Sequence, residues 1–326
     1  MLRSKLLLPF SFLYEKAINL RNTLYDRGYL KSKRLPVPVI SVGNLSAGGT
    51  GKTSFVIYLA NILKDKRICI LSRGYKRRTK GFHIVSEYGN LKLRWEEAGD
   101  EPYLMAKLLP FASVVVSENR YEGGLKAVEK LSPDVIILDD GFQHRRLYRD
   151  MDILLLKKKD LRDRLLPAGN LRERISSLNR ADVIVLSYQE IEPFEFFTGK
   201  PTFKAFRVFN KILTSSFETL PLDFIKDKEV VAFCGLGDNE QFLKILKKLP
   251  IKVKKFIPFP DHHDYRDFTV EEKEIYLTTP KDLVKFEGKP NVYALGFELK
   301  VEREERLRKL LDGLFSDRYY LHPPEL

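Results

Sequence analysis

The sequence predicts an α/β fold in which a parallel sheet is flanked by helices, with a second, smaller α/β domain following it in the chain. Between residues 38 and 186, short runs of β-branched and apolar residues alternate with helix-forming stretches, a rhythm typical of parallel sheets. The rhythm stops after Gln189 and resumes near Val230. A chain of 326 residues also exceeds the length that one hydrophobic core comfortably serves. Two domains of unequal length are therefore expected.

The first domain is expected to contain six strands, three helices and one hairpin. The strands are predicted at residues 37–42, 67–71, 113–117, 134–138, 153–156 and 182–186. The helices are predicted at 52–63, 101–109 and 121–131, and a hairpin of 81–85 against 91–95 interrupts the alternation. The run 135–138 is wholly apolar, which indicates a central strand buried on both faces.

The second domain is expected to be smaller and to follow a linker. Residues 191–209 are rich in Phe, Pro and Thr and lack the earlier rhythm. Beyond them we expect a strand ending at Gly235, a helix at 239–249, a strand at 251–257, a helix near 270–277, a strand at 291–295 and a charged last helix at 301–314. The predicted division is 1–35 for an N-terminal region, 36–190 for the first domain, 191–229 for the linker and 230–326 for the second domain.

The N-terminal region carries an apolar segment with basic flanks. Residues 6–14 are rich in Leu and Phe, and no small-residue cleavage site of the signal-peptide kind follows them. The run is far shorter than the roughly 20 residues that a spanning helix needs. The pattern suits an amphipathic, membrane-associated helix over 1–35 that lies at the interface. A helix that packs on its own domain would explain the apolar face equally well.

The charge balance is basic. The chain has 57 Lys and Arg against 44 Asp and Glu, a net charge of +13, which favours nucleic acid, anionic lipid or phosphorylated substrates as partners. The basic residues are scattered and no nucleic-acid-binding motif accompanies them, so no nucleic-acid partner is predicted. Cys69 and Cys234 each lie in an apolar stretch and are expected to be buried thiols in a reducing compartment.

A glycine-rich run lies between the first predicted strand and the first predicted helix. It consists of Ser46, Ala47, Gly48, Gly49, Thr50, Gly51, Lys52 and Thr53. Phosphate binding needs unobstructed backbone N–H groups, the positive end of a helix and a lysine ammonium, and this run offers all three. It departs from G-x-x-x-x-G-K-[ST] only at its first position, where Ser46 replaces glycine. The pattern predicts a P-loop NTPase-like sheet that binds the phosphates of a nucleotide.

Acidic residues are expected at the same edge of the sheet. Asp139 and Asp140 directly follow the central strand, where a P-loop protein needs a carboxylate to hold magnesium. Asp100 and Glu101 open a predicted helix. Asp100 is equally well explained as a helix cap, but phosphoryl transfer to an alcohol also benefits from a carboxylate that orients or deprotonates the hydroxyl.

Further motifs extend along nearly the whole chain. In the first domain they are G-N-L at 43–45, G-D-E-P at 99–102, D-D-G-F-Q-H at 139–144 and L-P-A-G-N-L-R-E at 166–173. In the second they are F-C-G-L-G at 233–237, F-P-D-H-H at 259–263 and T-T-P-K-D at 278–282. Together with the P-loop they resemble the tetraacyldisaccharide 4'-kinase family, the lipid A 4'-kinases, and D-D-G-F-Q-H is the most specific of them. One departure is Pro280, where the family has glutamate in T-E-K-D.

The resemblance implies a reaction and a location. It implies ATP- and Mg²⁺-dependent transfer of the γ-phosphate to the 4'-hydroxyl of a tetraacyldisaccharide 1-phosphate in lipid A biosynthesis. The partners implied are this lipid substrate and a membrane surface, at the cytoplasmic face of the bacterial inner membrane. The N-terminal segment with its basic flanks would then bring the enzyme to its lipid.

The resemblance also implies roles for individual residues. It assigns Lys52 to the β- and γ-phosphates, Thr53, Asp139 and Asp140 to the metal, and Glu101 to a further magnesium contact. Asp100 is expected to be the catalytic base, joined by His262 from the second domain.

For several residues a structural role is an alternative. Arg120 and Arg172 could stabilise charge on the transferring phosphate or act as ion-pair partners within the fold. His262 alone would read as a surface-loop histidine. The basic loop residues Arg73, Lys76, Arg77 and Arg78 could meet a phosphate or remain solvated.

The main alternative function is a P-loop ATPase of another class, a metal or protein maturation factor with no lipid acceptor. Such a protein would share the fold. A guanine-reading N-K-x-D motif is absent from the sequence, so a GTPase is not favoured.

Overall fold

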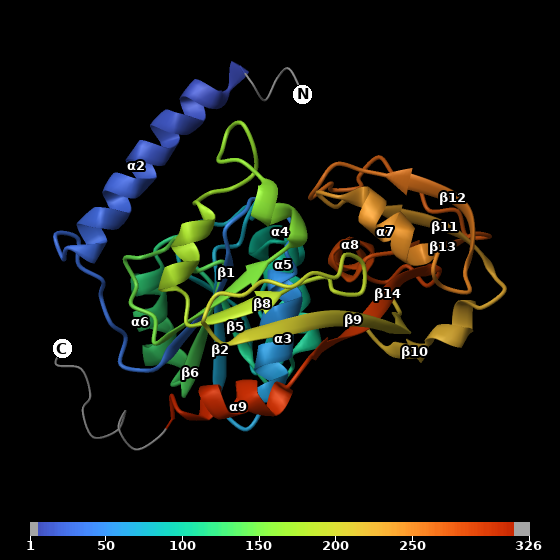
Figure 1. Cartoon of the computed structure of the whole chain (residues 1–326). Coiled ribbons are helices and arrows are strands. Elements are labelled where there is room, and N and C mark those ends of the chain that lie inside the picture. The colour runs from blue at the N-terminus through green and yellow to red at the C-terminus, as the bar shows by residue number, and fades with distance from the viewer. Residues whose placement is uncertain (1–5, 316–326) are drawn as a thin grey trace.

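The computed structural model describes residues 6–315, and within them one sheet runs through both halves of the molecule (Figure 1). The strand order is β12-β11-β13-β14-β9-β8-β7-β1-β6-β2-β5-β3-β4, and β10 pairs with β9. The α/β fold with a mostly parallel sheet and flanking helices is thereby confirmed.

The first half is built on six parallel strands. They are β1 (Val39–Asn44), β2 (Ile68–Ser72), β5 (Ser113–Val116), β6 (Val135–Asp139), β7 (Met151–Leu156) and β8 (Val183–Leu186). Every residue of these strands is buried, because helices and loops cover both faces of the sheet. All six strands were predicted from the sequence to within two residues at either end.

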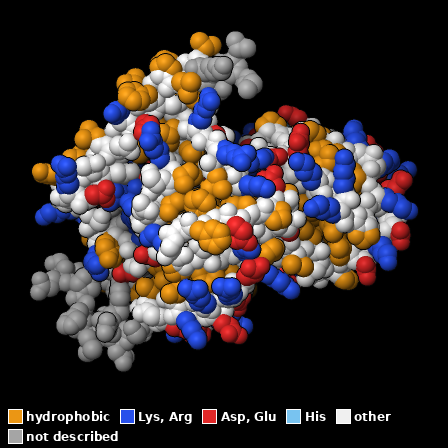
Figure 2. Space-filling model, viewed as in Figure 1, with side chains coloured by type: hydrophobic (Ala, Val, Ile, Leu, Met, Phe, Trp, Pro, Cys, Tyr) orange, Lys and Arg blue, Asp and Glu red, His pale blue; other side chains and the backbone are white. Residues whose placement is uncertain are grey.

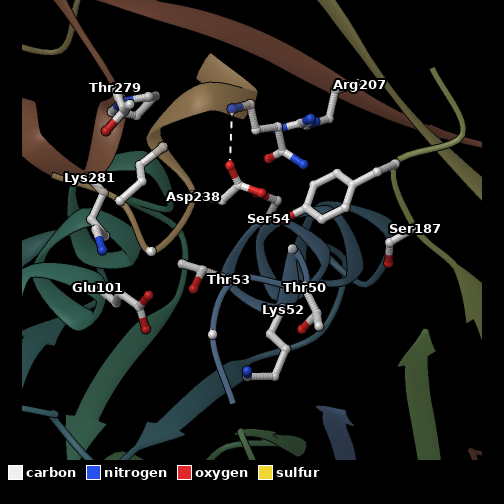
Figure 3. A pocket seen from close by; sticks show the side chains of 18 of the residues that line it. Thr50, Lys52, Thr53, Ser54, Glu101, Ser187, Arg207, Asp238, Thr279 and Lys281 are labelled. Carbon is white, nitrogen blue, oxygen red and sulfur yellow. Dashed lines mark hydrogen bonds between the residues drawn. The ribbon is translucent and has the colours of Figure 1, made fainter. Parts of the chain in front are cut away.

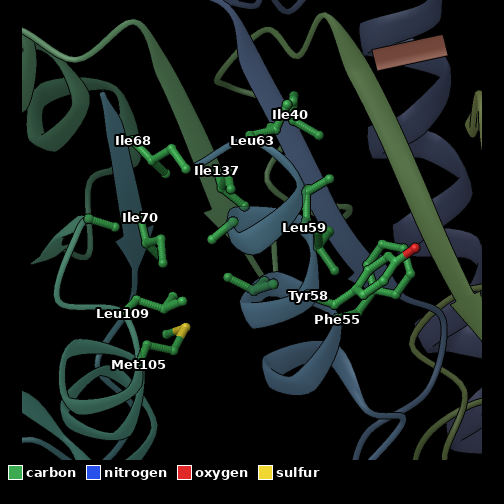
Figure 4. Close-up of a cluster of buried hydrophobic side chains, with 14 of the residues drawn as sticks. Ile40, Phe55, Tyr58, Leu59, Leu63, Ile68, Ile70, Met105, Leu109 and Ile137 are labelled. Atoms are coloured by element: carbon green, nitrogen blue, oxygen red, sulfur yellow. The ribbon is translucent and has the colours of Figure 1, made fainter. Parts of the chain in front are cut away.

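Helices α3 (Lys52–Ile62), α5 (Asp100–Leu108) and α6 (Arg120–Leu131) fill the predicted gaps. One face of the sheet packs against α3 and α5, and the opposite face packs against α6. Figure 4 shows the first of these cores, in which Leu59 of α3 and Met105 of α5 meet Ile40, Ile70 and Ile137 of the strands.

The predicted hairpin is present with a shifted turn. Strand β3 (His83–Glu87) pairs antiparallel with both β4 (Asn90–Leu91) and β5, and the short helix α4 (Trp95–Ala98) follows. Of residues 91–95, expected as the second arm of the hairpin, only Leu91 belongs to a strand. The insertion thus adds an antiparallel edge to the parallel sheet.

The segment 191–229, predicted as a linker, contains the longest strand. Strand β9 (Thr202–Leu213) pairs in parallel with β8 at its start and antiparallel with β14 (Val292–Val301) over the rest of its length. Strand β10 (Thr219–Pro221) and the 3₁₀ turn η3 (Leu222–Ile225) complete the segment. Strand β9 therefore joins the two halves by pairing with a strand of each. The domain limits at 35, 190 and 229 stay predictions.

The second half is a small parallel sheet with short helices. It contains β11 (Glu229–Cys234), β12 (Lys252–Pro258) and β13 (Ile275–Thr278), with α7 (Asn239–Leu246), α8 (Pro280–Leu283) and the 3₁₀ turn η4 (Val284–Phe286). The helix predicted near 270–277 is wrong. Residues 275–278 form β13 between β11 and β14, because this short apolar run is buried in the middle of the sheet.

The last helix returns to the first half. Helix α9 (Glu304–Asp312) buries Leu307 and Leu311 in the core that also contains α3, and it lies below that half in Figure 1. The Tyr58 hydroxyl of α3 donates to Glu304 Oε2 at 2.8 Å. Residues 316–326 of the predicted second domain lie outside the described residues.

The N-terminal segment forms helix α2 (Leu8–Asp26), which lies along one side of the first half (Figure 1). Several of its side chains bind the first half: among them, Ser11 Oγ donates to Leu165 O at 3.0 Å, Tyr14 Oη to Arg172 O at 3.0 Å, and Asn22 Nδ2 to Glu173 Oε2 at 2.8 Å. Hydrophobic side chains gather at the upper left of Figure 2, where this helix lies. The exposed apolar side chains of α2 are Leu8, Phe10, Phe12, Leu13 and Leu20, and Leu6 just before the helix is exposed as well. Among residues 6–315 no helix has the length and apolarity needed to cross a membrane.

An aromatic cluster stabilises the second half. Phe233 of β11 is fully buried, and its ring lies 5.0 to 6.3 Å, between centroids, from five other aromatic rings. These rings belong to Phe259, Tyr265, Phe268, Tyr276 and Phe286. Two rings of the cluster, Phe259 and Tyr265, contact the ring of His263, the neighbour of His262 in the chain.

Phe233→Ala is expected to lower the free energy of unfolding by about 3 to 5 kcal/mol, because it leaves a cavity among rings that cannot collapse into it. Chemical denaturation followed by circular dichroism measures the change. Phe197→Ala is the control, since Phe197 is 91% exposed and its removal should change the unfolding free energy by less than about 0.5 kcal/mol. Equal effects of the two substitutions would contradict the packing described.

Candidate active site

The predicted P-loop connects β1 to α3. Gly51 caps α3 with a φ of +84°, and Gly48 has a φ of +95°, backbone conformations that favour glycine. Asn44 Nδ2, at the end of β1, donates to Ser46 O at 2.7 Å and to Thr50 Oγ1 at 2.8 Å, which holds the loop closed from inside. The loop therefore presents backbone N–H groups and the N-terminus of α3 to one point, the arrangement that binds phosphate.

A second segment braces this loop from outside. Ala47 N donates to Asn170 O at 2.7 Å, and Arg172 N donates to Leu45 O at 2.6 Å. Ser46 and Leu171 also form an isolated antiparallel bridge. The L-P-A-G-N-L-R-E motif thus supports the P-loop through its backbone, and it carries Arg172 into the site.

The two aspartates that end β6 lie beside the P-loop lysine. Lys52 Nζ is 3.4 Å from Asp140 Oδ1, and Arg172 Nη1 donates to both carboxylate oxygens of Asp140 at 3.0 and 2.9 Å. Asp139 is 4% exposed, and Ser72 Oγ donates to its Oδ2 at 2.8 Å. The other oxygen of Asp139 is buried without a hydrogen-bond partner. Burial, followed by the charge of Asp140, raises the pKa of Asp139.

These residues fit a magnesium ion. The unpartnered oxygen of Asp139 is the kind of acceptor that a hard cation satisfies, and Thr53 and Glu101 line the same space. Burial is the main cause that raises the pKa of Glu101 above its ordinary value of 4.5, and the charges of Asp139 and Asp100 raise it further. A nearby cation would lower this pKa again. Within the described residues no three His, Cys, Asp or Glu side chains form a metal cluster by themselves, and a P-loop ion takes other ligands from phosphate and water.

Asp100 and His262 meet across the two halves. His262 Nδ1 is 2.8 Å from Asp100 Oδ2, and the Asp100 side chain is 6% exposed. Burial disfavours the ionised form, but the hydrogen bond and charge of His262, with Lys285 and Lys281, lower the pKa of Asp100 to about 2. His262 Nε2 lies 3.8 Å from Asp261 Oδ1, and the ring of Tyr75 packs edge-on at 5.1 Å between centroids. The structure thus brings together the two residues expected to form the base.

A cavity of about 1700 Å³ lies between the halves and connects these groups. Its lining includes residues 47–53 of the P-loop, Glu101, Asp139, Asp140, Arg172 and His262. The predicted phosphate-binding residue Ser46 is fully buried and does not line it, and Asp100 lies behind His262 and does not line it either. Figure 3 shows Lys52, Thr53 and Glu101 of the first half facing the same space as Thr279 and Lys281 of the second. Elsewhere an ion pair joins the two halves: Lys159 Nζ of the first half lies 3.1 Å from Asp238 Oδ2 of the second. The dashed line in Figure 3 ends at this Asp238 carboxylate.

Other predicted residues lie farther from the cavity or serve the fold. Arg120 is 4% exposed, donates to Ser117 O at 2.8 Å and does not line the cavity. Arg77 pairs with Glu118 at 2.6 Å, whereas Arg73 lines the cavity. Pro280, the departure from the family pattern, occupies the first turn of α8 behind the cap Thr279, a position that proline suits.

Several residues of the site were not predicted. Ser72 holds Asp139, Tyr75 packs on His262, and Lys281 and Lys285 lie near Asp100. The T-T-P-K-D motif contained Lys281, so the sequence did carry that signal. Tyr75 and Lys285 gave none, because their partners are far away in the sequence.

Three comparisons identify related proteins. The model of the family described as "Tetraacyldisaccharide-1-P 4'-kinase" matches residues 3–316. A tetraacyldisaccharide 4'-kinase of Aquifex aeolicus is 72% identical over 315 residues, covering 97% of this chain and 100% of that protein. Another, from Syntrophus aciditrophicus, is 35% identical over 352 residues and covers 96% and 93%.

A solved structure matches as well. The crystal structure of LpxK from Aquifex aeolicus in complex with ATP has a TM-score of 0.91 at 72% identity, covering 97% of this chain and 100% of that one. The resemblance noted in the sequence is confirmed, and the alternative of an ATPase of another class gains no support from these relatives.

Glu101→Gln is expected to flatten the pH dependence of stability in metal-free buffer. Because the pKa of Glu101 is raised, the folded protein keeps a proton that the unfolded chain releases above pH 4.5. Glu101 should therefore contribute a fall of about 1.4 kcal/mol per pH unit in the free energy of unfolding, from pH 4.5 up to its folded-state pKa. Denaturation at a series of pH values measures the slope.

The control for this titration is Glu272→Gln, which removes an exposed carboxyl and should leave the slope as it is. A wild-type slope in Glu101→Gln would show that Glu101 ionises normally in the folded protein.

Proposed function

This chain belongs to the tetraacyldisaccharide-1-phosphate 4'-kinase family and is an ATP-dependent kinase of lipid A biosynthesis, in which we propose that His262, oriented by Asp100, deprotonates the acceptor hydroxyl. The observation that carries the proposal is the 2.8 Å contact between these two side chains at the wall of the cavity that the P-loop also lines. The acceptor is the 4'-hydroxyl of a tetraacyldisaccharide 1-phosphate, and the donor is the γ-phosphate of ATP.

The nucleotide is held by the P-loop. Residues 48–53 supply backbone N–H groups to the phosphates, whereas the N–H of Ala47 already donates to Asn170 O. Lys52 supplies its ammonium to the β- and γ-phosphates. Thr53, Asp139 and Asp140 would hold Mg²⁺, with Glu101 as a further contact. The ion, when bound, neutralises charge on the β- and γ-phosphate oxygens. Lys52 is released from its 3.4 Å contact with Asp140 when phosphate takes its place.

Proton transfer follows from the tautomer of His262. With Nδ1 donating its proton to Asp100, Nε2 keeps a lone pair and can accept the proton of the acceptor hydroxyl. The hydroxyl oxygen forms a bond to the γ-phosphorus as the bond from this phosphorus to the β–γ bridging oxygen breaks, which leaves ADP and a protonated His262. The burial of Asp100 behind His262 supports this order over direct proton abstraction by Asp100.

Two arginines are proposed to stabilise charge. Arg172 lines the cavity and is bound to Asp140 through one nitrogen, so its remaining donors can face the transferring phosphate. Arg120 is buried, and its interaction with the charges of Asp139 and Asp140 supports a role at longer range. Burial also lowers the pKa of Arg120 to about 10, which leaves it charged at neutral pH.

Helix α2 is proposed to place the enzyme on the cytoplasmic face of the bacterial inner membrane. A substrate with four acyl chains stays in the bilayer, since each buried methylene contributes about 0.8 kcal/mol. The outer face of α2 exposes Phe10, Phe12 and Leu13 at 60%, 58% and 65%. Tyr14, Ile18 and Arg21 of the same helix line the cavity, so a bound membrane would lie beside the site.

His262→Ala and Asp100→Asn are each expected to lower kcat by about 10²- to 10⁴-fold, the usual contribution of a general base. The KM for ATP should change little, because the P-loop is untouched. Initial rates at saturating lipid, measured across pH, provide the test. His83→Ala is the matched control, since His83 lies on β3 away from the cavity. Wild-type kcat in either variant would remove the proposed pair.

Replacing Phe10, Phe12 and Leu13 together by Ser is expected to reduce binding to vesicles of phosphatidylethanolamine and phosphatidylglycerol by at least tenfold, because the apolar area available for insertion is lost. Flotation of the protein with the vesicles measures binding. Phe197→Ser removes a ring elsewhere that is even more exposed, at 91%, and this variant should bind as the wild type does. Undiminished binding of the triple variant would exclude α2 as the membrane contact.

A further inference from the structure

We propose that Lys285 is a positioning residue for phosphoryl transfer: its buried ammonium holds the Asp100 carboxylate and the backbone of the His262 loop in one arrangement. This inference rests on the proposed role of the Asp100–His262 pair. Lys285 does not line the cavity, so it acts through these residues and does not touch the substrate.

The contacts of Lys285 span the two halves. It lies in η4 of the second half, and its side chain is 2% exposed. Its Nζ is 3.4 Å from Asp100 Oδ2, the same oxygen that His262 Nδ1 contacts at 2.8 Å. The same ammonium donates to His263 O at 2.8 Å. One cation therefore reaches the carboxylate of the first half and the loop of the second half at once.

The burial of this ammonium is compensated. An unpaired ammonium in the interior would be strongly destabilising. Lys285 is surrounded instead by Asp100, by Asp282 with an oxygen at 3.8 Å, and by the ring faces of Trp95 and Tyr265 at 5.8 and 5.3 Å from their centroids. The cation is thus held in place from several sides and has little freedom to leave Asp100.

The His262 loop needs such support. His262 has a φ of +59°, a conformation that costs a non-glycine residue free energy and persists only where the surroundings enforce it. Both neighbours of His262 in the chain are held by lysines one helical turn apart. Lys281 Nζ contacts Asp261 Oδ1 at 2.6 Å, and Lys285 Nζ holds His263 O. These two contacts, one on each side of His262 in the chain, hold its ring against Asp100.

Lys281 and Lys285 therefore have different roles. Lys281 lines the cavity and can also meet ligand, whereas Lys285 has only interior contacts among the residues described. Loss of Lys285 should leave nucleotide and lipid binding intact and misplace the base. A displacement of about 1 Å at a reacting group can cost about a hundredfold in rate.

Lys285→Met is the first test, because it removes the charge and keeps the length of the side chain. We expect kcat to fall about 10- to 100-fold, with the KM values for ATP and lipid within about threefold of wild type. Lys289→Met, at an exposed position four residues on, is the matched control and should keep wild-type kinetics. A wild-type kcat in Lys285→Met would overturn the proposal.

A double-mutant cycle with Asp100→Asn separates positioning from a general structural role. If Lys285 acts partly through Asp100, Lys285→Met should lower kcat by a clearly smaller factor in the Asp100→Asn background than in the wild-type background. The same fold-loss in both backgrounds would overturn the role of Lys285 and leave the Asp100–His262 pair standing. Wild-type kcat in Asp100→Asn alone would instead reject the proposed function on which the inference rests.

Two further variants cover a failure of Lys285→Met to fold. Lys285→Arg keeps the positive charge and should retain kcat within about tenfold, whereas a loss equal to that of Asp100→Asn would contradict the proposal. Lys285→Ala leaves room for a small amine, so methylammonium in the assay should raise its kcat saturably. No rise in kcat with a folded Lys285→Ala protein would also count against it.

Discussion

The parallel pairing of β1 with β6 is the constraint on which the site depends. Val42 lies opposite Asp139 in this register, so the loop that leaves β1 and the aspartates that end β6 emerge at the same edge of the sheet. Strand β7 pairs with the other side of β1 and fixes its position. A shift of register by one residue would turn every buried side chain of β1 to the wrong face and separate the glycine loop from the acids.

Around that edge the fold concentrates charges that would repel one another in isolation. Asp100, Glu101, Asp139 and Asp140 approach the cavity from α5 and β6, and burial makes their ionisation costly. Cations from separate elements offset this cost: Lys52 from the P-loop, Arg172 from its bracing segment and Lys281 from α8. A highly charged ligand such as ATP can enter because the compensating groups are already in place.

The sequence predicted well what local patterns determine. The strands of the first half and the P-loop were found because each is an apolar run or glycine loop bounded by clear breaks. Strand β9 was missed because it follows an irregular segment with prolines, and only its start, where Phe203 and Ala205 flank Lys204, shows the alternation of a strand. A helix was predicted near 270–277, where the mostly acidic residues 271–274 precede the short apolar run, whereas residues 275–278 form a strand because they pair with β11 and β14. The contacts of Lys285 could not be predicted, since Asp100 and His262 reach it only in the folded chain.

The return of α9 to the first half has a consequence for synthesis. Leu307 and Leu311, from the end of the chain, complete the core that Phe55 and Leu59 of the P-loop helix begin. A nascent chain emerging from the ribosome can pair β1 through β8 early, but that core stays open to solvent until residues 304–312 have been made. The nucleotide-binding half therefore completes this core only after the second half has been translated.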